Sequence, residues 1–190
     1  MSFGASNTYI YAYIVFACVY LVASFTFVAS ALRVSTGLSR ARQTPTESAR
    51  TANGAVTSVL SHGQRLIDYT QLSTLLPLVY IVGSMFLGTV IMRNTDIART
   101  VNLGWIAFTV ACAAASILLT ILGIRESGAI GGTSDLSERL SGRAPEALQR
   151  VGLRLGVSAA LLLLVAVFTL LNLWSVISSL DTLSAVDFLL

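Results

Sequence analysis

The chain carries few side chains that could perform acid–base or nucleophilic chemistry. Its single histidine, His62, precedes Asp68 by six residues, and no other pair in the sequence suggests a general acid and base. A catalytic triad would also need a nucleophile held beside the histidine, and no Gly-x-Ser-x-Gly turn occurs. The cysteines, Cys18 and Cys112, lie in apolar stretches, where burial as small hydrophobic residues is the usual role. We therefore predict no catalytic site and no enzymatic activity.

Metal and cofactor sites have equally little support. Zinc sites usually need three or four clustered ligands, and a haem held by two histidines needs a second histidine. We therefore predict no metal site and no resident cofactor. An aromatic stripe of Tyr13, Phe16 and Tyr20, together with the lone His62, leaves open a bound lipid, quinone or pigment. Packing of the stripe against lipid or neighbouring helices is the competing interpretation.

The candidate residues named above must be positioned by helices that form from the long uncharged stretches of the sequence. The 190 residues are 55% hydrophobic and only 11% charged, with a mean hydropathy of +0.79. A helix of roughly 20 apolar residues crosses the hydrocarbon core of a bilayer. The sequence therefore predicts an all-α integral membrane protein, with one domain over residues 1–190. Its four transmembrane helices are expected at 8–32, 72–92, 102–124 and 155–180.

The arginines predict the orientation of these spans. Ten of the twelve lie in the loops 33–71 and 125–154, and two lie between the second and third spans. The positive-inside rule then places both longer loops on the cytoplasmic side and both termini outside, so that the spans form two hairpins. Membrane lipids or partner subunits are expected to contact the basic residues of the first loop, which are Arg33, Arg40, Arg42, Arg50 and Arg65. A nucleic-acid partner is not expected, because no dense basic patch with interleaved aromatic residues occurs.

The absence of lysine bears on the source of the chain. All twelve basic residues are arginine, which is typical of a GC-rich coding sequence, while a selected preference for arginine at lipid or partner contacts is the alternative. We expect a multi-pass protein of the plasma or inner membrane of a GC-rich organism.

The two longer loops contain signals for helix starts. Thr44 and Pro45 suit the start of one helix, and Pro145 suits the start of another that would run directly into the fourth span. We predict that Asn53-Gly54 interrupts the first of these helices and that residues 56–67 form a short amphipathic segment on the membrane or on a partner. Glycines between residues 128 and 132 predict a flexible start to the third loop.

Small residues at four-residue spacing predict close helix packing. The candidate helix-packing residues are Ser84 and Gly88 in the second span, with Ala107, Ala111 and Ala115 in the third. The sequence leaves open whether they pack within this chain or against another chain.

The functional hypotheses follow from these features. No span contains an Asp, Glu, Lys, Arg or His residue, which argues against an ion-coupled pump. The leading hypothesis is a non-catalytic membrane subunit that scaffolds, stabilises or assembles with other membrane subunits or with copies of itself. The alternative is an oligomeric channel or transporter for a small neutral solute, and a membrane enzyme using His62 and Asp68 is third. A solute path would be lined by Pro77, Ser84, Thr89, Thr109 and Asn172.

Overall fold

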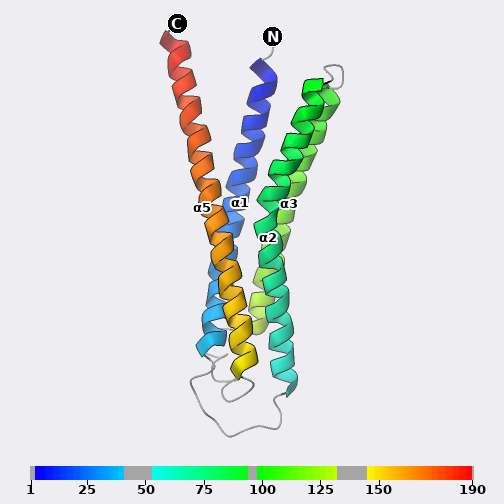
Figure 1. Ribbon diagram of the computed structural model, residues 1–190, viewed down its shortest axis with the longest axis vertical. Helices are drawn as coiled ribbons and strands as arrows, with labels where there is room; N and C mark the ends of the chain where they lie inside the picture. Colours follow the sequence, from blue (N-terminus) through cyan, green and yellow to red (C-terminus); the bar gives the residue numbers. More distant parts are fainter. Residues whose placement is uncertain (1–2, 41–52, 94–97, 132–144, 190) are drawn as a thin grey trace.

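The described residues form four long α-helices (Figure 1). The computed structural model describes residues 3–40, 53–93, 98–131 and 145–189. The helices are α1 (Phe3–Arg40), α2 (Asn53–Arg93), α3 (Ala98–Ile130) and α5 (Pro145–Leu189). Each of the four is long and apolar enough to cross a membrane. The prediction of an all-α, multi-pass membrane protein is confirmed at this level for the described residues.

The helices extend well beyond the predicted spans at the end of the bundle opposite the termini. Helix α1 continues from the predicted limit at residue 32 to Arg40, and α5 begins at Pro145, as its helix-start signal predicted. The predicted start at Thr44 and Pro45 lies outside the described residues. An uncharged run indicates which part of a helix crosses the bilayer. It does not indicate where the helix ends, because a helix can continue wherever it packs against a partner.

Two predictions for the longer loops are wrong. Residues 56–67 belong to α2 and do not form a separate short segment, and Leu66 and Ile67 are buried in the bundle. Asn53 begins α2, and the helix that Asn53-Gly54 was predicted to interrupt lies outside the described residues. Helix α3 runs through Gly128 and ends at Ile130. Gly131 follows with a φ of 96° and donates its N–H to the Gly128 carbonyl at 3.1 Å, the left-handed cap that favours glycine.

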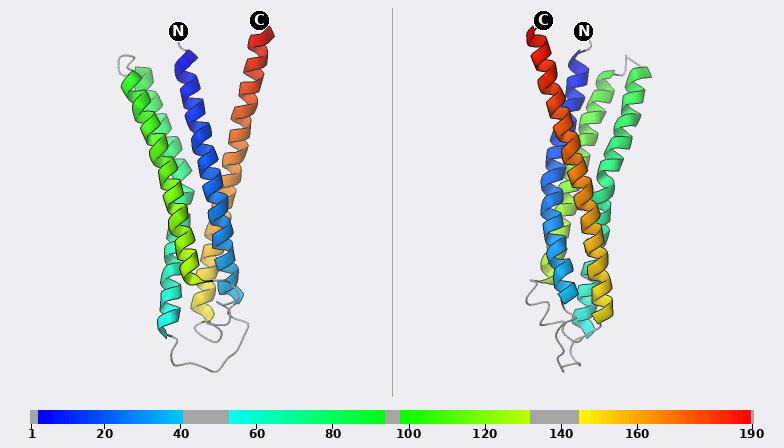
Figure 2. Two further views of the ribbon diagram at one scale, coloured as in Figure 1. Left: turned by 180° about the vertical axis from the view of Figure 1, so that it is seen from behind. Right: turned by 60° about the vertical axis from the view of Figure 1, so that its left-hand side comes forward.

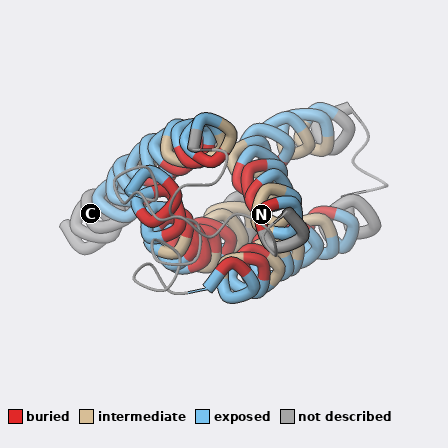
Figure 3. The backbone as a smooth tube through the Cα atoms, turned by 90° about the horizontal axis from the view of Figure 1, so that it is seen from below, coloured by how far each residue is buried: buried red, intermediate tan, exposed pale blue. Residues whose placement is uncertain are grey.

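The helices pack in a square, which Figure 3 shows from the end. Helix α1 contacts α5 and α3 extensively, and α2 contacts α3 and α5, whereas α1 and α2 barely touch. Consecutive helices α2 and α3 therefore pack against each other, while α1 and α2 lie on a diagonal. Helix α1 begins and α5 ends at the same end of the bundle (Figure 1). Which side of the membrane this end faces, and hence the arrangement as two hairpins of one orientation, stays a prediction.

The closest contact joins α1 to α5. The Oγ of Ser35 donates a hydrogen bond to the Gly152 carbonyl at 2.6 Å. A Cβ added at Gly152 would lie 3.1 Å from the Cβ of Leu38, and one added at Gly156 would lie 2.9 Å from the Oγ of Ser35. Two glycines four residues apart thus let α1 approach the backbone of α5, the small-residue arrangement common between membrane helices. The sequence analysis did not identify this pair.

The bundle is tight at one end and open at the other. Leu148, Leu155 and Leu162 of α5 are fully buried, whereas none of the residues 174–179 toward the other end of the helix is buried. Figure 2 shows the helices spreading apart toward the end that holds the termini. We call this spread region the outer half and the opposite region the inner half, after the predicted orientation.

A glycine where α3 meets α1 tests this packing. A Cβ at Gly123 would lie 2.3 Å from a ring carbon of Phe27, whose side chain is fully buried, whereas a Cβ at Gly128 meets nothing within 4 Å. We expect Gly123→Leu to lower the free energy of unfolding by about 1–3 kcal/mol through overpacking, while Gly128→Leu lowers it little. Thermal unfolding of the purified variants in detergent, followed by circular dichroism, measures both. Equal midpoints would contradict the packing.

Candidate functional site

Aromatic rings from three helices meet in the outer half of the bundle. Tyr80 of α2 is the centre of this cluster and is 2% exposed. Its ring stacks on Phe16 of α1 with the centroids 4.0 Å apart, and it lies 5.4 Å from the ring of Trp105 of α3. Phe108 stacks on Tyr80 at 5.9 Å, and Tyr9 meets Trp105 edge to face at 5.4 Å. These rings are too large to interdigitate as tightly as the glycine contacts of the inner half.

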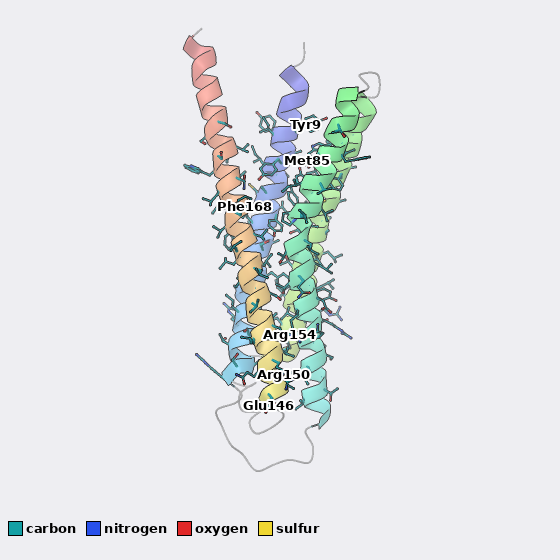
Figure 4. The ribbon with its side chains drawn as sticks, in the orientation of Figure 1. Tyr9, Met85, Glu146, Arg150, Arg154 and Phe168 are labelled. Atoms are coloured by element: carbon teal, nitrogen blue, oxygen red, sulfur yellow. The ribbon has the colours of Figure 1, made fainter. Side chains whose placement is uncertain are left out.

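Two adjoining cavities lie beside the aromatic cluster, with volumes of about 440 Å³ and about 480 Å³. Tyr13, Tyr80 and Val176 line both of them, so together they form one site, which we call the outer cavity. Its walls come from all four helices. Figure 4 shows two of its lining residues, Tyr9 on α1 and Phe168 on α5, in the outer half.

The lining of the outer cavity is mainly apolar and holds no charged side chain among the described residues. Most of its polar groups are satisfied within their own helix. Ser84 donates its hydroxyl to the Tyr80 carbonyl, and Asn172 donates its amide to the Phe168 carbonyl at 2.9 Å. The indole N–H of Trp105 is the exception, because it is buried and has no hydrogen-bond partner. A buried donor without a partner is uncommon, and here it belongs to a residue that lines the cavity.

The structure brings the predicted aromatic stripe of α1 to this site. Tyr13 and Phe16 line the outer cavity, while Tyr20 lies further toward the inner half and donates its hydroxyl to the Ser73 carbonyl at 3.2 Å. Sequence analysis did not name Tyr80, Trp105 or Phe108. The three-residue spacing of Trp105 and Phe108 on α3 was an available signal, but it does not reveal which face of the helix is turned inward.

The residues predicted to line a solute path divide into two groups. Pro77, Ser84 and Asn172 line the outer cavity. Thr89 is exposed, and Thr109 is buried with its hydroxyl 3.4 Å from that of Tyr80. The structure therefore gathers three of the five at one site.

A polar cluster joins α2 to α3 in the inner half. His62 donates a hydrogen bond from Nδ1 to Oε2 of Glu126, and Nη1 of Arg65 lies 3.8 Å from Oε1 of the same carboxylate. Glu126 is only 9% exposed. Asp68, the predicted partner of His62, instead accepts a hydrogen bond from Gln64 at 3.1 Å on the exposed face of α2. The predicted acid–base pair is therefore not assembled.

Sequence analysis missed Glu126 because the residue directly follows the uncharged run that ends at Ile124. Helix α3 continues for another turn and a half and carries the carboxylate into the bundle. As possible metal ligands, the cluster of His62, Arg65 and Glu126 contains only one histidine and one carboxylate. In the described part of the chain, no group of three or more His, Cys, Asp or Glu side chains could hold a metal ion. The cluster therefore links two helices electrostatically.

Most of the remaining predicted contact residues lie on the outside of the bundle, but Gly88 lines the outer cavity. Ala107 and Ala111 are exposed on α3, Ala115 is half-buried, and Gly88 has open space where a Cβ would be. Ala107 and Ala111 thus do not pack within this chain, and their packing against another chain stays a prediction. Arg33 and Arg40 are exposed at the inner end of α1, while Arg42 and Arg50 lie outside the described residues.

Comparisons with protein-family models, with curated proteins and with solved structures find no match to this chain. The site must therefore be interpreted from its own chemistry.

Removal of the Glu126 carboxylate tests the inner cluster. We expect Glu126→Ala to lower the free energy of unfolding by about 1.5–3 kcal/mol, because His62 loses a charged hydrogen-bonding partner and Arg65 loses an ion pair. Glu146→Ala is the matched control, since Glu146 pairs with Arg150 at 3.3 Å on an exposed surface. We expect that exposed pair to contribute less than about 1 kcal/mol. Chemical unfolding in detergent measures both, and similar losses would show that the inner cluster adds no special stability.

Proposed function

We propose that this protein is a non-catalytic membrane subunit whose outer cavity holds a neutral, hydrophobic ligand with a planar ring or conjugated chain. The observation that carries the proposal is the outer cavity itself, with aromatic rings from three helices on its walls. Binding sites for small molecules are typically concave and mainly apolar, with volumes of about 300–1,000 Å³ and a few placed polar groups.

The chemistry of the walls favours a particular class of ligand. Aromatic rings such as those of Tyr13, Phe16 and Tyr80 attract other planar π-systems by offset stacking and edge-to-face contact. The unpaired N–H of Trp105 is suited to donate a hydrogen bond to a carbonyl oxygen of the ligand. A quinone, or a pigment with a polar ring, combines both features. Charged ligands are disfavoured, since none of the described lining residues carries a compensating charge.

The outer surface of α3 supports a role as a subunit. Gly104, Ala107 and Ala111 are exposed on this helix at spacings of three and four residues. Small residues facing away from the bundle allow another membrane helix to approach closely. Partner chains, whether different subunits or copies of this one, are expected to pack there.

The ligand can be tested by filling the cavity. Gly88 lines it and has open space where a side chain would enter, so Gly88→Phe adds a ring without striking the backbone. We expect this variant to lose co-purifying ligand at least about tenfold, which corresponds to about 1.4 kcal/mol. Extraction of the protein from its native membrane in mild detergent, then absorption spectroscopy and mass spectrometry of solvent extracts, provides the measurement.

The matched control is Gly128→Phe, which adds the same ring in open space outside the outer cavity. We expect this variant to retain the ligand of the unmodified protein. Equal ligand loss in both variants, or recovery of only bulk phospholipid from the unmodified protein, would contradict the proposal. Mass spectrometry of the co-purifying chains in the same sample tests the subunit role.

A second function is favoured by the position of Asn172, Pro77 and Ser84. These residues line a cavity in the half of the bundle where the helices spread, as a carrier open to one side would require (Figure 2). If the protein transports a small neutral solute, Asn172→Leu should reduce glycerol flux into proteoliposomes about tenfold, because a polar wall group is lost. Stopped-flow light scattering measures this flux. Flux equal to that of protein-free liposomes would remove the transport hypothesis.

A further inference from the structure

A second binding site lies in the inner half of the bundle, on the surface between α2 and α5. It is a groove of about 400 Å³, separate from the outer cavity. The two helices approach closely beside it, since a Cβ at Gly63 of α2 would lie 2.7 Å from the side chain of Val151 of α5. The apolar residues that form the floor of the groove are Ile67, Leu153, Val157 and Leu161, and its polar residues are Gln64, Gln71, Arg154 and Ser158.

Arg154 is the only cation that lines the groove among the described residues. Its side chain is exposed and has no ion pair with a described residue, whereas Arg150, one turn earlier on α5, pairs with Glu146 at 3.3 Å. Asp68, on the adjacent stretch of α2, holds the amide of Gln64 and does not pair with Arg154. Figure 4 shows Glu146, Arg150 and Arg154 in sequence along the inner part of α5. Arg154 therefore presents a free positive charge beside apolar surface.

The α5 side of the groove changes in polarity along its length, while α2 contributes the amides of Gln64 and Gln71. On α5, Arg154 and Leu161 are seven residues apart, which corresponds to about 10 Å along a helix. Over this distance the lining passes from a guanidinium to the aliphatic side chains of Val157 and Leu161. A phospholipid has the same gradient from headgroup to acyl chain, and an anionic headgroup complements the unpaired charge.

We propose that this groove binds one anionic phospholipid. Arg154 pairs with the headgroup phosphate, for which the planar guanidinium is suited to bidentate hydrogen bonding. Gln64 and Ser158 stand beside it as further hydrogen-bonding groups, and one acyl chain lies along Val157 and Leu161. The predicted orientation supports the assignment, because the inner end of the bundle would then face the leaflet that carries anionic lipid. This site is independent of any ligand in the outer cavity.

Exposed arginines elsewhere provide matched controls. Arg33 on α1 and Arg125 on α3 are also exposed near the inner end, and neither lines this groove or the outer cavity. Any general attraction between arginine and an anionic membrane surface should be similar for all three residues. Only Arg154 combines the charge with an adjoining apolar groove.

Native mass spectrometry of the full-length protein, with phosphatidylglycerol or phosphatidylcholine added, tests the proposal. We expect one phosphatidylglycerol per chain to be retained in preference to phosphatidylcholine. Arg154→Gln should weaken that binding at least about tenfold, because the headgroup phosphate loses a charged hydrogen-bonding partner. Arg125→Gln should leave it unchanged, and Val157→Trp, which fills the floor of the groove, should weaken it with the charge intact.

Circular dichroism of each variant measures whether the helices are retained. Equal retention of the two lipids by the unmodified protein would overturn the proposal. Equal losses in Arg154→Gln and Arg125→Gln would also overturn it, because they would indicate surface attraction without a site.

Discussion

No water is available inside a membrane to satisfy a backbone N–H or C=O group, and the rest of this structure depends on that constraint. The described residues meet it with long helices, and many of the hydroxyl groups follow the same rule. Thr70, Thr74 and Thr169 each donate a hydrogen bond to a carbonyl of their own helix, four residues earlier. Few polar groups are then left to join one helix to another, so the arrangement of the helices depends on how their surfaces fit together.

The two halves of the bundle differ in the kind of side chains through which the helices pack. In the inner half, Gly152 and Gly156 admit Ser35 against the backbone of α5, and the carboxylate of Glu126 links α3 to α2. In the outer half, the contacts are between large rings grouped around Tyr80. Small residues bring helices together, whereas aromatic residues hold them apart and leave space between them. The outer cavity is a direct consequence of this change in residue size along the helices.

The two proposed binding sites use different chemistry because they lie at different depths. The outer cavity lies among uncharged side chains, where an unpaired charge would be costly, and it offers aromatic faces and the N–H of Trp105. The groove beside Arg154 lies at the edge of the predicted fourth span, where a guanidinium can remain charged. A protein with both sites would hold a neutral ligand within its bundle and a charged lipid on its surface.

The sequence by itself determined the number and type of the elements. Runs without charge are long enough to cross a bilayer, and this property depends only on local composition, as does the helix start at Pro145. Tertiary structure alone decided which faces meet. In the folded bundle, Ala107 and Ala111 face outward and Trp105 faces inward. His62 pairs with Glu126 and not with Asp68. A membrane helix is apolar on all sides, so its sequence shows no amphipathic pattern to mark the buried face, and only contact with the other helices distinguishes lipid from neighbour.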